Sequence, residues 1–236
     1  DIPMTGDGPA DLQVIARFKG GAGWVAYPDE TMQRASHALP TPEGVWVVDP
    51  VDADGVDDLL AEVGEEGTGA SDVAGVAVCL DRHKRDAAAV ARRHDVDVYV
   101  PTWMSGVVDE IDAPVSRFAG ELGESGFESF VIRESSLPPW QEAGLYNPAT
   151  GTMVVPESVG TVSYFLAGDE QLGVHPMLRL TPPDALRSHG RPEQLRVGHG
   201  AGVQENAAST IEAALNSSRA NTPSLYAKTL KGFLTG

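Results

Sequence analysis

The sequence predicts an α/β protein in which helices pack on a parallel or mixed sheet. Three observations support this fold class. Apolar residues make up 42% of the 236 residues, which is enough for a sizeable core. In the first half, short unbroken apolar runs alternate with helical segments, as expected for strands that are buried on both faces of a sheet. In the second half, shorter strands are separated by tight turns, which is typical of hairpins.

The first half, from about residue 10 to 115, alternates strands and helices. Gly20, Gly21 and Gly23 are expected to form a loop between two facing strands. Asp54 can cap the first helix, and Gly64 can end it. The expected strands are 12–18, 24–27, 45–48, 73–80 and 96–100, and the expected helices are 54–64 and 86–94. This order of elements favours a sheet with parallel neighbours.

The second half, from about residue 116 to 236, is richer in hairpins. The turn Asn147–Gly151 predicts a hairpin between its two flanking strands. The loop Gly198–Gly202 should lie at the N-terminus of a helix. The segment 168–192, which carries four prolines, is expected to be an irregular excursion over the surface. The expected strands are 127–133, 144–146, 152–155 and 195–197, and the expected helices are 206–219 and 226–233. Because no internal repeat divides the chain, we expect a single domain over residues 1–236.

The chain is strongly acidic, with 34 acidic against 17 basic residues and a formal net charge of -17. Such a charge repels nucleic acid and anionic membrane surfaces, and no stretch has the roughly 20 apolar residues of a membrane helix. Arginine greatly outnumbers lysine. This composition is typical of a halophile, in which concentrated salt screens the repulsion between carboxylates; an ordinary acidic mesophilic protein is the alternative. The lone Cys79 excludes an intramolecular disulfide and, with no signal peptide at the start, predicts a cytoplasmic location.

Polar loops follow four apolar strands, and the carboxyl ends of strands are where sites gather in α/β proteins. The loops contain Asp49, the run 81–86, Glu157 and His199. The expected ligand pocket is Asp49, Arg82, His83, Lys84, Asp86, Glu157 and His199.

The order and spacing of these loops resemble the metallo-β-lactamase fold superfamily. In that family one strand ends in an Asp-containing loop, a second delivers His-x-His-x-Asp-His, a later hairpin delivers a bridging Asp, and a Gly-His-Gly-type loop gives the last metal ligand. The resemblance runs from about Val14 to Ala213. It implies a four-layer αββα sandwich, with two mixed sheets packed face to face and helices outside, and a zinc-dependent hydrolase.

The metal motif is degenerate when it is carried over by position. Arg82 and Lys84 stand where the first two histidines belong, and Asp86 keeps the carboxylate. Ala87 replaces the third histidine, and no histidine between His94 and His175 supplies the middle ligand of the second half. Glu157 falls at the bridging position, with Asp169 as a competitor, and His199 matches the last ligand.

These substitutions predict a site without metal. A divalent ion beside Arg82 and Lys84 would be repelled by several kcal/mol, even at an effective dielectric constant of about 20. We therefore expect both cations to occupy the metal volume and to pair with Asp86, Glu157 and Asp49. The alternative is a residual zinc site at Asp86, Glu157 and His199, because a catalytic zinc needs three protein ligands.

The functional expectation is a metallo-β-lactamase-like protein of unknown substrate that is not a conventional hydrolase and needs no cofactor. The alternatives are a zinc-dependent hydrolase of an ester, thioester or phosphoester, a binding protein for an anionic small molecule, and a metal-independent enzyme. In the last case His199 or His83 would act as general acid or base, and Lys84 or Arg82 would clamp an oxyanion. The leading catalytic candidates are His199 and Lys84. His94 is expected to be structural. His37, in an expected loop over residues 36–40, and His175 could overhang the pocket, but a structural role is favoured for both.

Overall fold

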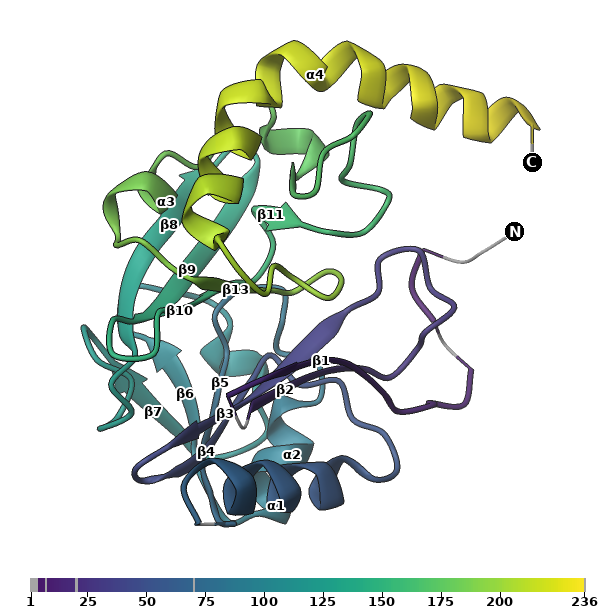
Figure 1. The fold of residues 1–236 in the computed structure, drawn as a ribbon. Helices are drawn as coiled ribbons and strands as arrows, with labels where there is room; N and C mark the ends of the chain where they lie inside the picture. The colour runs from purple at the N-terminus through teal and green to yellow at the C-terminus, as the bar shows by residue number, and fades with distance from the viewer. Residues whose placement is uncertain (1–3, 7, 20, 70, 236) are drawn as a thin grey trace.

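Two β-sheets face each other and carry helices on their outer sides (Figure 1). The computed structural model describes residues 4–6, 8–19, 21–69 and 71–235, and describes side chains in the last helix as far as residue 228. The first sheet contains β1 (Gln13–Phe18), β2 (Gly21–Val25), β3 (Ala35–Thr41), β4 (Gly44–Val48), β5 (Val73–Ala77), β6 (Val98–Pro101) and β7 (Val115–Phe118), in that order. The second contains β13 (Gln194–Val197), β10 (Thr152–Val155), β9 (Pro139–Asn147) and β8 (Glu128–Ser136), in that order. A short third pair joins β11 (Val159–Gly160) to β12 (Gly173–Val174).

Both main sheets are mixed, as the sequence predicts. In the first sheet β1 to β4 form an antiparallel meander, and β4 to β7 run parallel. Parallel neighbours need crossover connections, which α1 (Val56–Gly67) and α2 (Ala87–Arg93) provide. In the second sheet β8, β9 and β10 are antiparallel and β13 joins β10 in parallel. The hairpin predicted at Asn147–Gly151 is confirmed, since Asn147 pairs with Thr152 across it.

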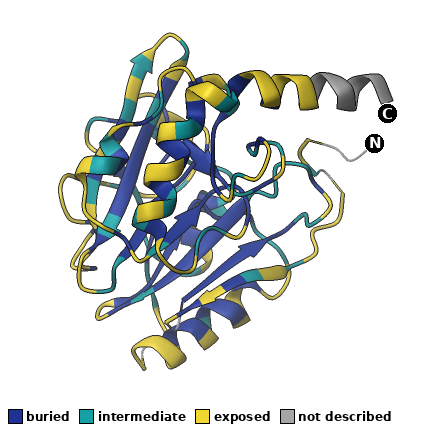
Figure 2. Ribbon diagram, turned by 45° about the horizontal axis from the view of Figure 1, so that its top comes forward, coloured by how far each residue is buried: buried dark blue, intermediate teal, exposed yellow. Residues whose placement is uncertain are grey.

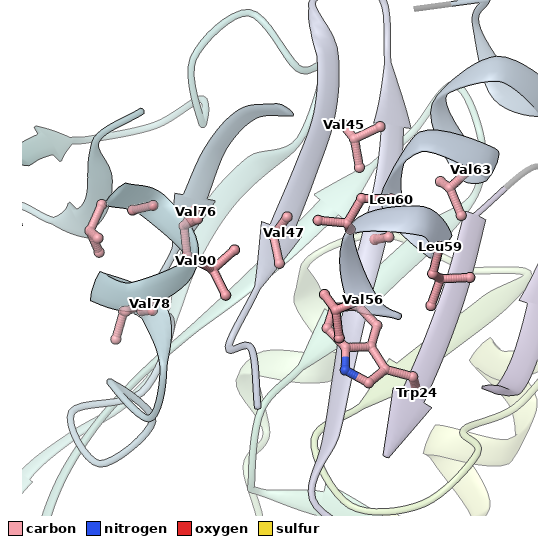
Figure 3. Close-up of a cluster of buried hydrophobic side chains, with 14 of the residues drawn as sticks. Trp24, Val45, Val47, Val56, Leu59, Leu60, Val63, Val76, Val78 and Val90 are labelled. Atoms are coloured by element: carbon pink, nitrogen blue, oxygen red, sulfur yellow. The ribbon is translucent and has the colours of Figure 1, made fainter. Parts of the chain in front are cut away.

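Three layers of apolar side chains separate the four layers of backbone. In the outer layer of the first sheet, α1 packs Leu59 and Leu60 over Trp24 and Val47 (Figure 3). Between the sheets, residues such as Trp46 meet residues of β9 and β10. On the outer face of the second sheet lie α3 (Ala185–Ser188) and α4 (Ala207–Thr235), whose exposed sides are clear in Figure 2. The four-layer αββα arrangement is therefore confirmed.

Several element boundaries differ from the sequence-based expectation. The expected glycine loop is strand β2 at Gly21 and Gly23, while Gly20 lies outside the described residues. The segment around His37, expected as a loop, is strand β3, and β7 was not predicted. The two helices expected after residue 206 form one helix, α4, with Pro223 inside it. None of the described helices has both the length and the apolar character needed to span a membrane.

The segment 168–192 is anchored in the fold by a buried ion pair, so it is more than a surface excursion. It contains β12, one short helical turn at Pro176–Leu178 and the short helix α3. Arg179 is fully buried and binds both carboxylate oxygens of Glu170. Its guanidinium also donates to the carbonyl of Ser218, and Asn221 donates to Glu170, so the pair docks α4.

Replacing Arg179 by Met should lower the free energy of unfolding by about 3–5 kcal/mol, because the change leaves a carboxylate without its buried partner. Burial alone would raise the pKa of Glu170, but hydrogen bonds from Arg179, Asn221 and the N–H of Ala167 outweigh it and lower that pKa below its ordinary value. A lowered folded pKa contributes stability above the unfolded value, and the contribution is lost as the pH falls below it. Urea unfolding as a function of pH should therefore show both lower stability and weaker acid dependence in the variant.

The matched control is Arg17→Met, which removes an exposed ion pair with Glu62. We expect a change of at most about 1 kcal/mol there. Equal losses in the two variants would contradict the anchoring role assigned to Arg179.

Candidate functional site

A cluster of ionisable side chains lies where the carboxyl ends of β4, β5, β10 and β13 meet. Asp49 follows β4, and Glu157 and His199 follow β10 and β13. His83 and Arg85 belong to the connection between β5 and α2. That connection leaves the first sheet and runs beside β9, because Leu80 pairs with a residue of β9. The cluster therefore forms at the junction of the two sheets.

His83 bridges the two carboxylates of the cluster. Its Nδ1 lies 3.1 Å from Asp49 Oδ2, and its Nε2 lies 2.9 Å from Glu157 Oε2. Asp49 is itself oriented by the backbone N–H of Cys79, which donates to Oδ1 at 2.9 Å. Asp49 also adopts a φ of 48°, a left-handed conformation that Asp tolerates better than most residues and that ends the strand.

His199 approaches the same carboxylate from the second sheet. Its Nε2 lies 3.1 Å from Glu157 Oε2, and its Nδ1 lies 2.9 Å from the carbonyl oxygen of Met32. The loop before it packs tightly, since a Cβ at Gly198 would lie 1.9 Å from the carbonyl oxygen of Pro156. Glycine is therefore required at this position for His199 and Glu157 to come together.

The hydrogen-bond partners of the two histidines allow two positions for each ring proton. Each imidazole faces an oxygen acceptor at both ring nitrogens: Asp49 or Met32 at Nδ1, and Glu157 Oε2 at Nε2. A neutral imidazole has one proton and satisfies one acceptor. With the Nδ1 protons donated to Asp49 and Met32, the Nε2 lone pairs of His83 and His199 both face the same carboxylate oxygen. Three acceptors then converge, namely the two Nε2 lone pairs and Glu157 Oε2. They require either a shared cation or additional protons between them.

A second proton on His199 is disfavoured at this position. Burial lowers the pKa of His199, although Glu157 partly opposes that effect. Arg85 Nη2 lies 3.1 Å from His83 Nε2, and since a guanidinium can only donate, this contact needs a lone pair on Nε2. For Glu157, burial alone would raise the pKa, but hydrogen bonds donated by the His199 and His83 rings lower it far below its ordinary value, so without an ion Nε2 protons can satisfy this carboxylate. When both ring protons lie on Nδ1 instead, Arg85 can donate to His83 Nε2, and a shared cation would satisfy all three groups.

Glu142 holds the backbone of the loop that carries Glu157. Its carboxylate is fully buried and accepts hydrogen bonds from the N–H groups of Glu157 at 2.7 Å and Ser158 at 2.8 Å. The Ser158 hydroxyl and Trp140 Nε1 donate to its other oxygen. Burial raises the pKa of Glu142, and these hydrogen bonds oppose that effect.

His175 lies at the edge of the cluster but has a different proton arrangement. Its Nδ1 accepts a hydrogen bond from the N–H of Met177, so its proton is on Nε2, 3.5 Å from Glu157 Oε1. The rings of Trp140 and Phe165 pack against it. Burial lowers the pKa of His175 to about 4, so it is neutral at pH 7. Because its Nε2 lone pair is absent, His175 is a neighbour of the cluster and not a candidate ligand.

The structure places Arg82, Lys84 and Asp86 away from this cluster. Arg82 lies over the ring of Trp140 and pairs with Asp81. Lys84 pairs with Glu110 at the surface. Asp86 accepts a hydrogen bond from the N–H of Asp52.

The expected pairing of Arg82 and Lys84 with Asp86, Glu157 and Asp49 is therefore wrong, as is the grouping of Asp86 with Glu157 and His199. The physical reason is an alternation of side chains along the loop: His83 and Arg85 face inward, so Arg82 and Lys84 face outward. Asp169, the competitor of Glu157, is exposed and lies outside the cluster.

Sequence reasoning missed Arg85 and Glu142 and assigned His37 to a loop. Arg85 is two residues from His83, and that spacing was an available signal. Glu142 is a single charged residue in the otherwise largely apolar strand β9, which also signals a buried role. His37 is structural, with its Nε2 donating to the carbonyl of Val197, and His94 pairs with Asp57.

Comparison with solved structures identifies the fold. The chain is similar to the DIM-1 metallo-β-lactamase exposed to ceftazidime, with a TM-score of 0.62 at 13% identity over 92% of this chain and 99% of the other. The chain has the metallo-β-lactamase fold. Metallo-β-lactamases from Pontibacter korlensis and Hirschia baltica are also similar, with TM-scores of 0.60 and 0.57, identities of 13% and 8%, and coverage of 89% of this chain in both cases and 99% and 98% of theirs. No protein-family model and no curated protein matches the sequence.

The donor set of this metallo-β-lactamase fold meets the requirements of one metal ion. Within the described residues, ligand atoms of His83, Glu157 and His199 lie within 4.8 Å of one another. Tetrahedral zinc with bonds of 2.0–2.2 Å places its ligand atoms about 3.3 Å apart, close to the 2.9 and 3.1 Å found here. Histidine ligands commonly donate their second N–H to a carboxylate or a backbone carbonyl, the roles that Asp49 and Met32 have.

Proposed function

We propose that this protein binds one divalent transition-metal ion through His83 Nε2, Glu157 Oε2 and His199 Nε2, and that it is a metal-dependent hydrolase of an ester, thioester or phosphoester. The observation that carries the proposal is the convergence of His83 Nε2 and His199 Nε2 on one carboxylate oxygen of Glu157, with an oxygen acceptor beside each Nδ1 that can hold the ring proton. A bound ion supplies Lewis-acid chemistry and lowers the pKa of water. Support for the reaction class comes from the fold, since the similar structures are named metallo-β-lactamases.

The chain's own residues orient this site. Asp49 and the carbonyl of Met32 hold the two imidazoles in the tautomer that leaves Nε2 free. Glu142 fixes the backbone that presents Glu157. Such outer hydrogen bonds raise the basicity of the ligands and set their direction.

Arg85 lies beside the proposed ion and opposes its binding. Its guanidinium carries a permanent charge, and its Nη2 lies 3.1 Å from His83 Nε2. At about 4 Å and an effective dielectric constant of 20, each pair of unit charges repels by about 4 kcal/mol, which His83, Glu157 and His199 must offset. The cation beside the cluster is thus Arg85, and not Arg82 or Lys84.

The burial of the ligands favours a second candidate function, a metal-binding protein without catalysis. The side chains of His83 and His199 are 6% and 4% exposed, and structural metal sites are closed in this way. Three surface cavities of about 710, 560 and 290 Å³ are lined by residues outside the cluster. A buried ion would then join the two sheets.

Metal analysis of protein purified without a metal-affinity column tests the site. We expect about one equivalent of a transition metal such as zinc per chain, which a strong chelator removes. Hydrolysis of generic ester, thioester and phosphodiester substrates that is lost with the metal would support the hydrolase. One equivalent of metal with no such hydrolysis would favour the structural role, and protein that takes up no metal when supplied with it would refute both.

A further inference from the structure

We propose that Arg85 and the ion together form a binding site for an anionic oxygen, so that the substrate or ligand carries a phosphate or carboxylate group. This inference rests on the single-ion site proposed above. It adds the chemical class of the ligand and the residue that selects it.

The guanidinium of Arg85 is held in place by backbone carbonyls. Its Nη1 donates to the carbonyl oxygens of Ala35 at 3.1 Å and Asp49 at 2.9 Å, which uses both hydrogens of that nitrogen. Its Nη2 donates to His83 Nε2 at 3.1 Å. Arg85 adopts a φ of 37°, so the backbone is also held in the left-handed region. The group is thus oriented by contacts that do not depend on the ligand.

Metal binding would remove one partner of Arg85. The Nη2 contact uses the same His83 lone pair that an ion would take, and a lone pair cannot serve both. Nη2 would then be a charged donor beside the ion without an acceptor from His83. A phosphate or carboxylate oxygen is the acceptor that a guanidinium matches best in charge and geometry.

The net charge of the cluster changes sign when the ion binds. Without an ion, the carboxylates of Asp49 and Glu157 outnumber the guanidinium of Arg85 by one negative charge. A divalent ion reverses this to one positive charge. An anion is therefore repelled from the cluster before the ion binds and attracted afterwards.

Arg85 is also the least buried member of the cluster. As a whole residue it is of intermediate exposure, whereas Asp49, His83, Glu157 and His199 are buried. Burial also lowers the pKa of its guanidinium, so the charged end points into the cluster.

Calorimetric titration with inorganic phosphate, and separately with acetate, tests the proposal on the full chain loaded with Co²⁺ and on the metal-free chain. We expect binding of at least one of the two anions to the loaded protein, and none to the metal-free protein. Arg85→Gln should weaken that binding about tenfold or more, and Arg85→Lys should restore part of it, because lysine keeps the charge but not the planar fork. Arg82→Gln, in the same loop but facing outward, should leave it unchanged.

Metal affinity is measured in parallel, so that failure of the metal site can be distinguished from failure of the anion-binding role of Arg85. Arg85→Gln should bind Co²⁺ at least as tightly as the wild type, because a neighbouring positive charge is removed. Equal anion affinity in Arg85→Gln and wild type, or anion binding without metal, would overturn the role of Arg85 while leaving the metal site intact. Absence of metal binding in the wild type would overturn both.

Discussion

Glu157→Gln should weaken the binding of Co²⁺ or Zn²⁺ by at least about 100-fold, since loss of an outer hydrogen bond to a ligand already costs 10- to 100-fold. The amide keeps the size of the side chain but removes the negative charge at the point where His83 and His199 converge. Competition with a chromophoric chelator measures the affinity. The electronic spectrum of bound Co²⁺ reports whether the same ligands remain.

The control for this prediction is Glu134→Gln, which makes the same chemical change at an exposed position of β8. It should bind metal as the wild type does. If Glu157→Gln and Glu134→Gln bind the ion equally well, the ion is held elsewhere and the assignment of these ligands is wrong.

Glu142→Ala is expected to lower the free energy of unfolding by about 3–5 kcal/mol, because it leaves several buried donors without an acceptor. These donors are the backbone N–H groups of Glu157 and Ser158 and the indole N–H of Trp140. Chemical unfolding in urea measures the loss. The change should also weaken metal binding, since the loop that presents Glu157 is released.

Two further variants separate the positioning role of Glu142 from simple destabilisation. Glu142→Gln keeps an oxygen acceptor and nearly the same volume, so it should recover part of both the stability and the metal affinity. Glu134→Ala should cost less than about 0.5 kcal/mol, as expected for an exposed site. If Glu142→Ala and Glu134→Ala have the same free energy of unfolding, Glu142 does not hold the loop that carries Glu157.

The strands of the first sheet show which features can be predicted from a single sequence. Residues 45–48 form an unbroken apolar run, and their burial on both faces makes β4 easy to find. Strand β3 contains Ser36, His37 and Pro40, residues that do not signal a strand by composition. It forms because it is paired on both sides, by β2 and β4, and because His37 finds a partner in the other sheet. Tertiary pairing there overrides local preference.

The expectations about habitat, location and partners stay predictions. The net charge of -17 and the scarcity of lysine are the grounds for the predicted high-salt setting, and the net charge is the ground for expecting no nucleic-acid or membrane partner. The likeness to solved structures concerns the fold. It carries no information about the organism or the compartment.

The spacing of apolar residues was sufficient to predict the α/β class, because buried strands and amphipathic helices each leave a characteristic apolar pattern in the sequence. It was also sufficient to place Asp49, Glu157 and His199 at strand ends. The loop between β5 and α2 has no such period, so the direction of its side chains depends on how the chain crosses from the first sheet to β9. That crossing turns His83 and Arg85 inward and Arg82 and Lys84 outward, and it therefore decides which side chains join Asp49, Glu157 and His199 in the cluster.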